Sequence, residues 1–217
     1  MYKLNTRVWS CSLAIMLAMV LALPAVTLAS ESEEEEGYIS LFNGKDLEGW
    51  VVQGLEKAKP DVEDGVLVVG GWDYWAVITE KEFHNFTLKL DYMVEERGNS
   101  GVLIHAPKEE VYKHAFEIQI ADDAGEDPSK ETTGAIFDHV APSSNPQKPA
   151  GEWNSMTIHY EEPSISVMIN GETVIDQVDI TTLEDLEHTH EKGAIALQRN
   201  DYKKAVHYKN IRIKPLD

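Results

Sequence analysis

Three segments of this chain alternate apolar and polar residues, and this alternation strongly limits what the chain can fold into. They cover residues 99–105, 115–122 and 193–200. A period of two residues is typical of a β-strand that buries one face and exposes the other. The segments 86–94 and 207–213 follow the same pattern. We therefore expect a mostly β domain.

Turn signals separate the expected strands. Asp64-Gly65 and Asn170-Gly171 each lie between two apolar runs, and both pairs supply the positive φ angles of tight hairpin turns. The one expected helix is short, at 182–186, where Thr182 could act as the N-cap. Many short strands without helical crossovers predict an all-β fold, a two-sheet antiparallel β-sandwich.

Two segments interrupt the strand pattern. Residues 121–133 and 141–151 are too polar and proline-rich to be strands, so we expect long loops there. Long ordered loops beside a sheet commonly carry function, although ordinary surface variation also produces them.

Residues 1–29 have the three parts of a signal peptide. Lys3 and Arg7 precede an apolar run at 12–26, and small residues follow it. An uncleaved anchor helix is the alternative, because the run approaches membrane-spanning length. A cleaved signal predicts export to the periplasm or the exterior of a bacterium.

The acidic stretch 30–37 is expected to be a disordered spacer, with calcium binding as the alternative. Residues 38–217 are then a single domain. The sole cysteine, Cys11, lies inside the predicted signal, so the mature chain can form no disulfide or thiolate metal site. The net charge of −19 argues against nucleic acid or an anionic membrane as partner. It is compatible with a neutral substrate.

The polar positions of the alternating strands fall on one open face. They are Asn99, His105, Glu117, Gln119, Gln198 and Asn200. A set so rich in amides and carboxylates is typical of a concave sheet that binds sugar. Glu117 could be a general base or a ligand to sugar hydroxyls, with Gln119 fixing orientation, or it could be a surface glutamate.

His105 ends its strand, and alternation with Val102 and Ile104 places it on the open face. A histidine that titrates near neutral pH suits proton transfer or oxyanion stabilisation, and a structural role is the alternative. His188 and His190 are spaced so that the two side chains could bind one metal ion.

Three tryptophans could stack on sugar rings, and core packing is the alternative for each. They are Trp72, Trp75 and Trp153.

The signature of a retaining glycosidase is absent. It would place two carboxylates roughly 5 Å apart on alternating positions of one strand. Gln119 stands two residues after Glu117, and Asp122 has the wrong parity. No Gly-x-Ser-x-Gly elbow, phosphate-binding glycine loop or His-Glu-x-x-His helix occurs either. Ordinary hydrolase chemistry is therefore not supported.

Eight motifs, in order along nearly the whole mature chain, resemble the 3-keto-disaccharide hydrolase family. They lie at 40–50, 99–101, 116–122, 133–137, 151–154, 169–171, 193–198 and 210–213. The resemblance implies a concanavalin A-like jelly roll with long loops at its concave face. It also implies an exported bacterial enzyme that cleaves glycosides whose sugar ring carries a 3-keto group.

Such a substrate needs a base and a stabiliser of an enediolate. A ketone at C3 acidifies the C2 proton, and the enediolate formed on its removal can expel the group at C1. The resemblance leaves Glu117 and His105 as candidate bases. Hydrogen bonds from Asn99, Gln119 and Gln198 could stabilise the charge, or a divalent metal ion held by Glu117, Asp122 or a histidine could do so.

The remaining candidates for substrate binding are Asp122, Trp153, Arg199 and Asn200. His105 stands where family members usually carry arginine, and Arg199-Asn200 stands where they often have aspartate and histidine. A non-catalytic, lectin-like carbohydrate-binding module on the same fold is therefore the alternative function. A structural domain attached to a surface is a third reading.

Overall fold

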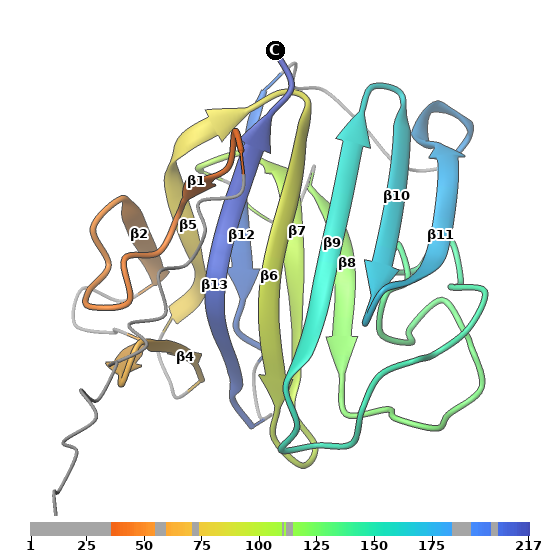
Figure 1. Ribbon diagram of the computed structural model, residues 1–217, viewed down its shortest axis with the longest axis horizontal. Coiled ribbons are helices and arrows are strands. Elements are labelled where there is room, and N and C mark those ends of the chain that lie inside the picture. Colours follow the sequence, from red (N-terminus) through yellow and green to blue (C-terminus); the bar gives the residue numbers. More distant parts are fainter. Residues whose placement is uncertain are drawn as a thin grey trace, which may run out of the picture. The chain divides into compact units, whose positions relative to one another are not determined.

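Two antiparallel sheets pack face to face in the computed structural model, and Figure 1 shows the larger sheet in front of the smaller. The structure describes residues 36–54, 60–70, 74–109, 111, 115–183, 192–200 and 204–217. The predicted all-β sandwich is confirmed. The predicted signal peptide and most of the predicted spacer lie outside the described residues.

The larger sheet has the strand order β11-β10-β9-β6-β13-β4-β3, and β1 pairs with β13. Its strands are β1 (Ile39–Ser40), β3 (Asp61–Glu63), β4 (Val66–Val69), β6 (Phe86–Val94), β9 (Asn154–Glu161), β10 (Ser164–Ile169), β11 (Glu172–Asp179) and β13 (Val206–Pro215). In β6, buried and half-buried residues alternate along the whole strand, as the period-two pattern predicts.

The smaller sheet has the order β2-β5-β12-β7-β8. Its strands are β2 (Trp50–Gly54), β5 (Tyr74–Phe83), β7 (Asn99–Ala106), β8 (Phe116–Ala121) and β12 (Gly193–Gln198). The main core fills the space between the two sheets, and a smaller apolar cluster around Leu103 and Ala196 lies apart from it. Residues of β7, β8 and β12 therefore face either the main core or the outer side of this sheet.

Both predicted hairpin turns are present. Asp64 and Gly65 join β3 to β4, and Asn170 and Gly171 join β10 to β11, all four with positive φ. The helix predicted at 182–186 is replaced, where the structure describes it, by a 3-10 turn at Ile180–Thr182. Asp179 caps this turn by accepting a hydrogen bond from the Thr181 N–H.

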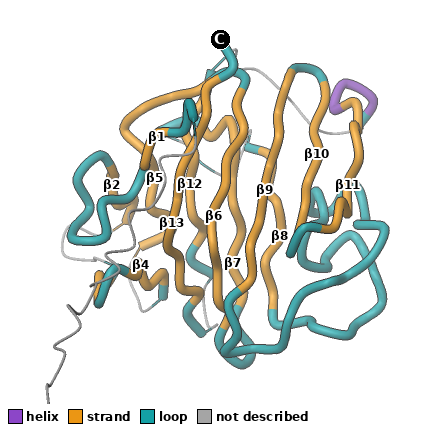
Figure 2. The backbone as a smooth tube through the Cα atoms, in the orientation of Figure 1, coloured by secondary structure: helices purple, strands orange, loops and turns teal. Residues whose placement is uncertain are grey.

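The predicted loops at 121–133 and 141–151 are free of strand except for Ala121, the last residue of β8, and Figure 2 shows the long loop tracts beside β8 and β11. The segment that follows the first loop pairs with the edge of β8. The Phe137 N–H donates to the Glu117 carbonyl at 2.9 Å, and the Gly134 N–H donates to the Gln119 carbonyl at 2.9 Å. This pairing fixes the loop against the strand that carries the candidate site. The described residues contain no helix long and apolar enough to span a membrane.

Candidate active site

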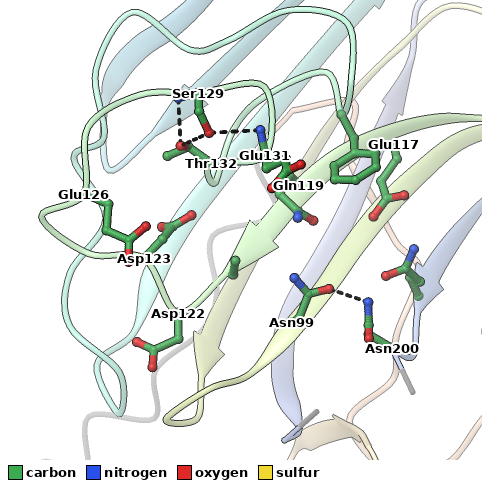
Figure 3. A pocket seen from close by; sticks show the side chains of 13 residues that line it. Asn99, Glu117, Gln119, Asp122, Asp123, Glu126, Ser129, Glu131, Thr132 and Asn200 are labelled. Carbon is green, nitrogen blue, oxygen red and sulfur yellow. Dashed lines mark hydrogen bonds between the residues drawn. The ribbon is translucent and has the colours of Figure 1, made fainter. Parts of the chain in front are cut away.

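The outer face of the smaller sheet carries a cleft of about 540 Å³, bounded on one side by the loop that follows β8 (Figure 3). This volume is within the range of small-molecule binding sites. The strands contribute Asn99, Glu117, Gln119, Ala121, Gln198 and Asn200 to its lining, and the loop region contributes Asp122, Asp123, Glu126, Ser129, Glu131, Thr132 and Phe137. The cleft thus brings together six of the nine residues expected to form the site.

Strand register explains why residues distant in sequence meet here. β7 and β8 are antiparallel, with Asn99 opposite Ala121, Gly101 opposite Gln119 and Leu103 opposite Glu117. Residues at alternate positions of both strands share the outer face. The Asn200 side chain, just beyond β12, donates a hydrogen bond of 2.7 Å to the Asn99 side chain.

Glu117 is the titratable group most altered by the cleft. Burial raises the pKa of Glu117 to about 7, and the neighbouring Gln198 amide opposes this shift in part. Desolvation disfavours the charged form of a carboxyl group, which explains the direction. A carboxyl group with this pKa exchanges protons readily near neutral pH and has the property required of a general base.

Two glutamines offer polar atoms to a ligand. Gln119 is only 4% exposed. Its Oε1 accepts a hydrogen bond from the Ile120 N–H, and the side chain lines the cleft. The buried Oε1 of Gln198 lacks a hydrogen-bond partner among the described residues. Because an unsatisfied buried acceptor is costly, the Gln198 Oε1 atom is available to accept a hydrogen bond from a sugar hydroxyl.

Asp123 holds the loop in place from inside. Its carboxylate accepts hydrogen bonds from the Thr133 N–H (2.7 Å), the Thr133 hydroxyl (3.1 Å), the Asn145 amide (3.2 Å) and the Gln147 amide (2.9 Å). Burial raises the pKa of Asp123, while the bonds from Thr133 and Asn145 lower it. This carboxylate ties both long loops together, so its role is positioning.

The expected placement of His105 on the open face was wrong. Its side chain is fully buried, with the ring centroid 4.5 Å from that of Tyr160, and Nε2 lies 2.9 Å from the His84 carbonyl. A register shift between β7 and β12 sets Ile104 and His105 opposite one residue, and His105 has a φ of 53°. Such a bulge adds one residue and reverses the parity, so the side chain turns inward.

Trp153 and Arg199 do not line the cleft either. The Trp153 ring lies under the Lys209 ammonium group, 3.9 Å from Nζ, and Lys209 belongs to β13 of the larger sheet. Arg199 is 5% exposed, one residue beyond β12. It follows Gln198, which faces the cleft, so the alternation of a strand turns Arg199 inward.

Other expectations concern residues that the structure does not describe. Trp72, His188 and His190 are outside the described residues, as is the side chain of Trp75. No group of three or more His, Cys, Asp or Glu side chains within the described ranges is placed to hold a metal ion. Glu117 and Asp122 share the cleft, but the described side chains do not complete a metal-binding set around them.

The loop acids Glu126 and Glu131 and the ring of Phe137 were not expected in the site. Their signal in the sequence is indirect. The loop was expected to carry function, and 133–137 is one of the family motifs, but alternation says nothing about which loop residues fold back over a sheet.

The fold and the cleft together define a concanavalin A-like jelly roll with a polar site on the outer face of one sheet. The chain belongs to the family described as the 3-keto-alpha-glucoside-1,2-lyase-like domain, which matches residues 37–214. This agrees with the family resemblance found in the sequence.

Relatives support the assignment. The chain is 24% identical to a 3-keto-disaccharide hydrolase of Bacteroides thetaiotaomicron, with 85% of this chain and 80% of the relative aligned. A proposed glycosyl hydrolase of Parabacteroides distasonis superposes with a TM-score of 0.74 at 29% identity, covering 87% of this chain and 98% of the other. A Bacillus subtilis protein with a galectin-like fold shares the fold at 12% identity, with a TM-score of 0.58, and 82% and 94% of the two chains are covered.

Proposed function

We propose that this protein cleaves 3-keto-glycosides, including 3-keto-disaccharides, and that Glu117 removes the C2 proton. The observation that carries the proposal is the carboxyl group of Glu117, which lies in a polar cleft and has its pKa raised to about 7 by burial. Family membership and the name of the Bacteroides relative support a 3-keto sugar as substrate.

The proposed reaction requires only one general base. Glu117 accepts the proton from C2, and the C–H electron pair forms an enediolate with the C3 ketone. The enediolate then expels the substituent on C1. The departing group takes up a proton, and an unsaturated keto sugar remains. Addition of water across C1 and C2 gives the free 3-keto sugar, with a proton returned to C2. Release of the unsaturated sugar would make the overall reaction that of a lyase.

The amide groups of the cleft supply the stabilisation. The Gln119 Nε2 atom and the side chains of Asn99, Gln198 and Asn200 are hydrogen-bonding groups that line the same space as Glu117. Donors held in a partly desolvated site stabilise a developing oxyanion more strongly than water does. Asn99 is oriented for this by the hydrogen bond from Asn200.

The arrangement suits elimination better than ordinary glycoside hydrolysis. Hydrolysis of an unactivated glycoside requires a second carboxyl group at a defined separation. The next cleft-facing residue of β8 after Glu117 is Gln119, an amide, and the other carboxyl groups of the cleft come from the loop region rather than from the strand. One base is sufficient when the 3-keto group activates the C2 proton.

The test compares a 3-keto-glucoside with its unoxidised parent, with and without chelator, and follows release of the leaving group. We expect cleavage of the keto sugar alone and its loss in Glu117→Gln, which keeps the shape of the side chain. Loss on chelation with recovery on adding a divalent cation would establish a metal requirement. Saturable binding of both sugars without release would overturn the proposal and favour the carbohydrate-binding module.

Export is proposed on the sequence alone. We propose that residues 1–29 are removed by signal cleavage and that the enzyme acts in the periplasm or outside the cell. Amino-terminal sequencing of protein from each cell fraction tests this, and an intact N-terminus in the membrane fraction would favour the anchor.

A further inference from the structure

The cleft has two chemically different sides. Figure 3 shows Glu117 and Asn200 on one side and Glu126 and Asp123 on the other. Under the proposed mechanism, the keto-sugar ring must place C2 at Glu117. The leaving group on C1 then extends into the remaining part of the cleft, toward the loop.

The side chains that the loop region contributes to the cleft are acidic. Asp122, Glu126 and Glu131 line the cleft, and the lining contains no Lys, Arg or His side chain among the described residues. We call these three residues the acidic side. Asp122 accepts a hydrogen bond from the Arg97 N–H at 2.7 Å. Glu126 and Glu131 are exposed, and their carboxylates have no ion pair or hydrogen bond within the described part of the chain.

A second observation points to a ligand in the same space. Gln198 lines the cleft, and its buried Oε1 has no hydrogen-bond partner among the described residues. A buried acceptor of this kind requires a hydrogen-bond donor that the ligand brings. A sugar hydroxyl or an ammonium group satisfies it, whereas a carboxylate or sulfate does not.

We propose that the acidic side receives the leaving group and selects leaving groups that are uncharged or carry an amine, against those that carry a carboxylate or sulfate. This inference rests on the proposed function. An anionic leaving group would lie beside the carboxylates of Glu126 and Glu131, and the described residues of the cleft supply no cation to compensate them, whereas an ammonium group would be attracted.

Three 3-keto-glucosides test the selectivity. Their alkyl leaving groups have the same length and end in a trimethylammonium, a tert-butyl or a carboxylate group. For the wild-type protein we expect kcat/KM to fall in that order, by about tenfold from the first to the last, because exposed charge pairs are individually weak. Added salt should reduce the difference through screening.

Variants test whether the dependence of kcat/KM on the charge of the leaving group arises in the cleft. Glu126→Gln/Glu131→Gln should reduce the cation-to-anion ratio of kcat/KM to about twofold or less. The control Glu63→Gln/Glu152→Gln removes the same charge from two exposed residues that do not line the cleft, and it should keep the wild-type ratio. Intrinsic differences between the leaving groups cancel because the same substrates are compared on each protein.

Calorimetry should also measure the affinity of each of the three glycosides for the Glu117→Gln variant. These affinities distinguish failure of the proposed cleavage reaction from failure of the proposed charge selectivity. A charge-dependent affinity without cleavage by the wild type would overturn the proposed function and support the acidic side. Equal affinities, absence of all binding, or the same loss of selectivity in the control variant would overturn this inference.

Discussion

The side chain of Glu117 lies directly over Gly101 on the neighbouring strand. A β-carbon at position 101 would be 2.7 Å from Cγ and 2.8 Å from Cδ of Glu117, closer than non-bonded carbon atoms approach. The φ angle of Gly101 is not in the left-handed region, so it is contact with Glu117, rather than backbone strain, that favours glycine. Gly101 thus provides the space in which the carboxyl group is held.

Gly101→Ala should therefore displace the carboxyl group. We expect kcat/KM toward a 3-keto-glucoside to fall by about 100-fold, because a displacement near 1 Å is enough to misplace a catalytic group. Steady-state kinetics and thermal unfolding should be measured together. A cleavage rate near that of the wild type in a folded Gly101→Ala protein would show that the position of Glu117 is not critical.

Glu117 also makes stability depend on pH. Its pKa rises from the ordinary glutamate value of 4.5 to about 7 in the folded protein, so the folded state binds the proton more tightly than the unfolded chain. The stability of the wild type should fall as pH rises between these values, by about 3 kcal/mol in total. Glu117→Gln does not titrate there.

Urea unfolding of both proteins at about pH 5 and pH 8 measures this effect. The variant should gain stability relative to the wild type at the higher pH, although it loses activity. If the difference in the free energy of unfolding between the variant and the wild type is the same at both pH values, Glu117 is not desolvated.

His105 should matter for stability. Its ring packs among Phe86, Phe116 and Tyr160 in the interior. His105→Ala should lower the free energy of unfolding by about 2–4 kcal/mol through loss of packing. The kcat/KM of the folded fraction should change by less than about threefold, since the ring lies outside the cleft. A large loss of activity with unchanged stability would instead support the catalytic role expected from the sequence.

Asp123 should keep the two long loops structurally ordered. Asp123→Ala leaves the buried Thr133 N–H without its acceptor, at a cost of about 1–3 kcal/mol, and removes one of the two acceptors of the Asn145 and Gln147 amides. We expect faster amide hydrogen exchange over 121–149 and a higher KM. Asp127→Asn, on the same loop and outside the cleft lining, is the control. Equal exchange in the two variants would contradict the positioning role.

Alternation along β8 was enough to predict that Glu117 and Gln119 share an open face, and the structure places both in the cleft. Their roles stay predictions. The same reasoning failed at His105 because a bulge shifts the parity at one position, and nothing in the sequence around Ile104 signals it. A rule of period two holds only while the strand stays regular.

The acidic side of the cleft could not be located from the sequence. Glu126 and Glu131 lie in a loop that pairs back onto β8 through backbone hydrogen bonds of residues 134–137, and such bonds are independent of side-chain pattern. Trp153, in contrast, was expected in the site from the sequence but does not line the cleft. An aromatic residue suited to sugar stacking instead packs under Lys209 on the other sheet.

The dependence of kcat/KM on pH for cleavage of a 3-keto-glucoside tests the central claim most directly. If Glu117 acts as the base, kcat/KM should rise about tenfold per pH unit below pH 7 and level off above it, and Glu117→Gln should abolish this reaction. A rate that is independent of pH between about 5 and 8, or that persists in Glu117→Gln, would contradict the assignment of Glu117 as the base.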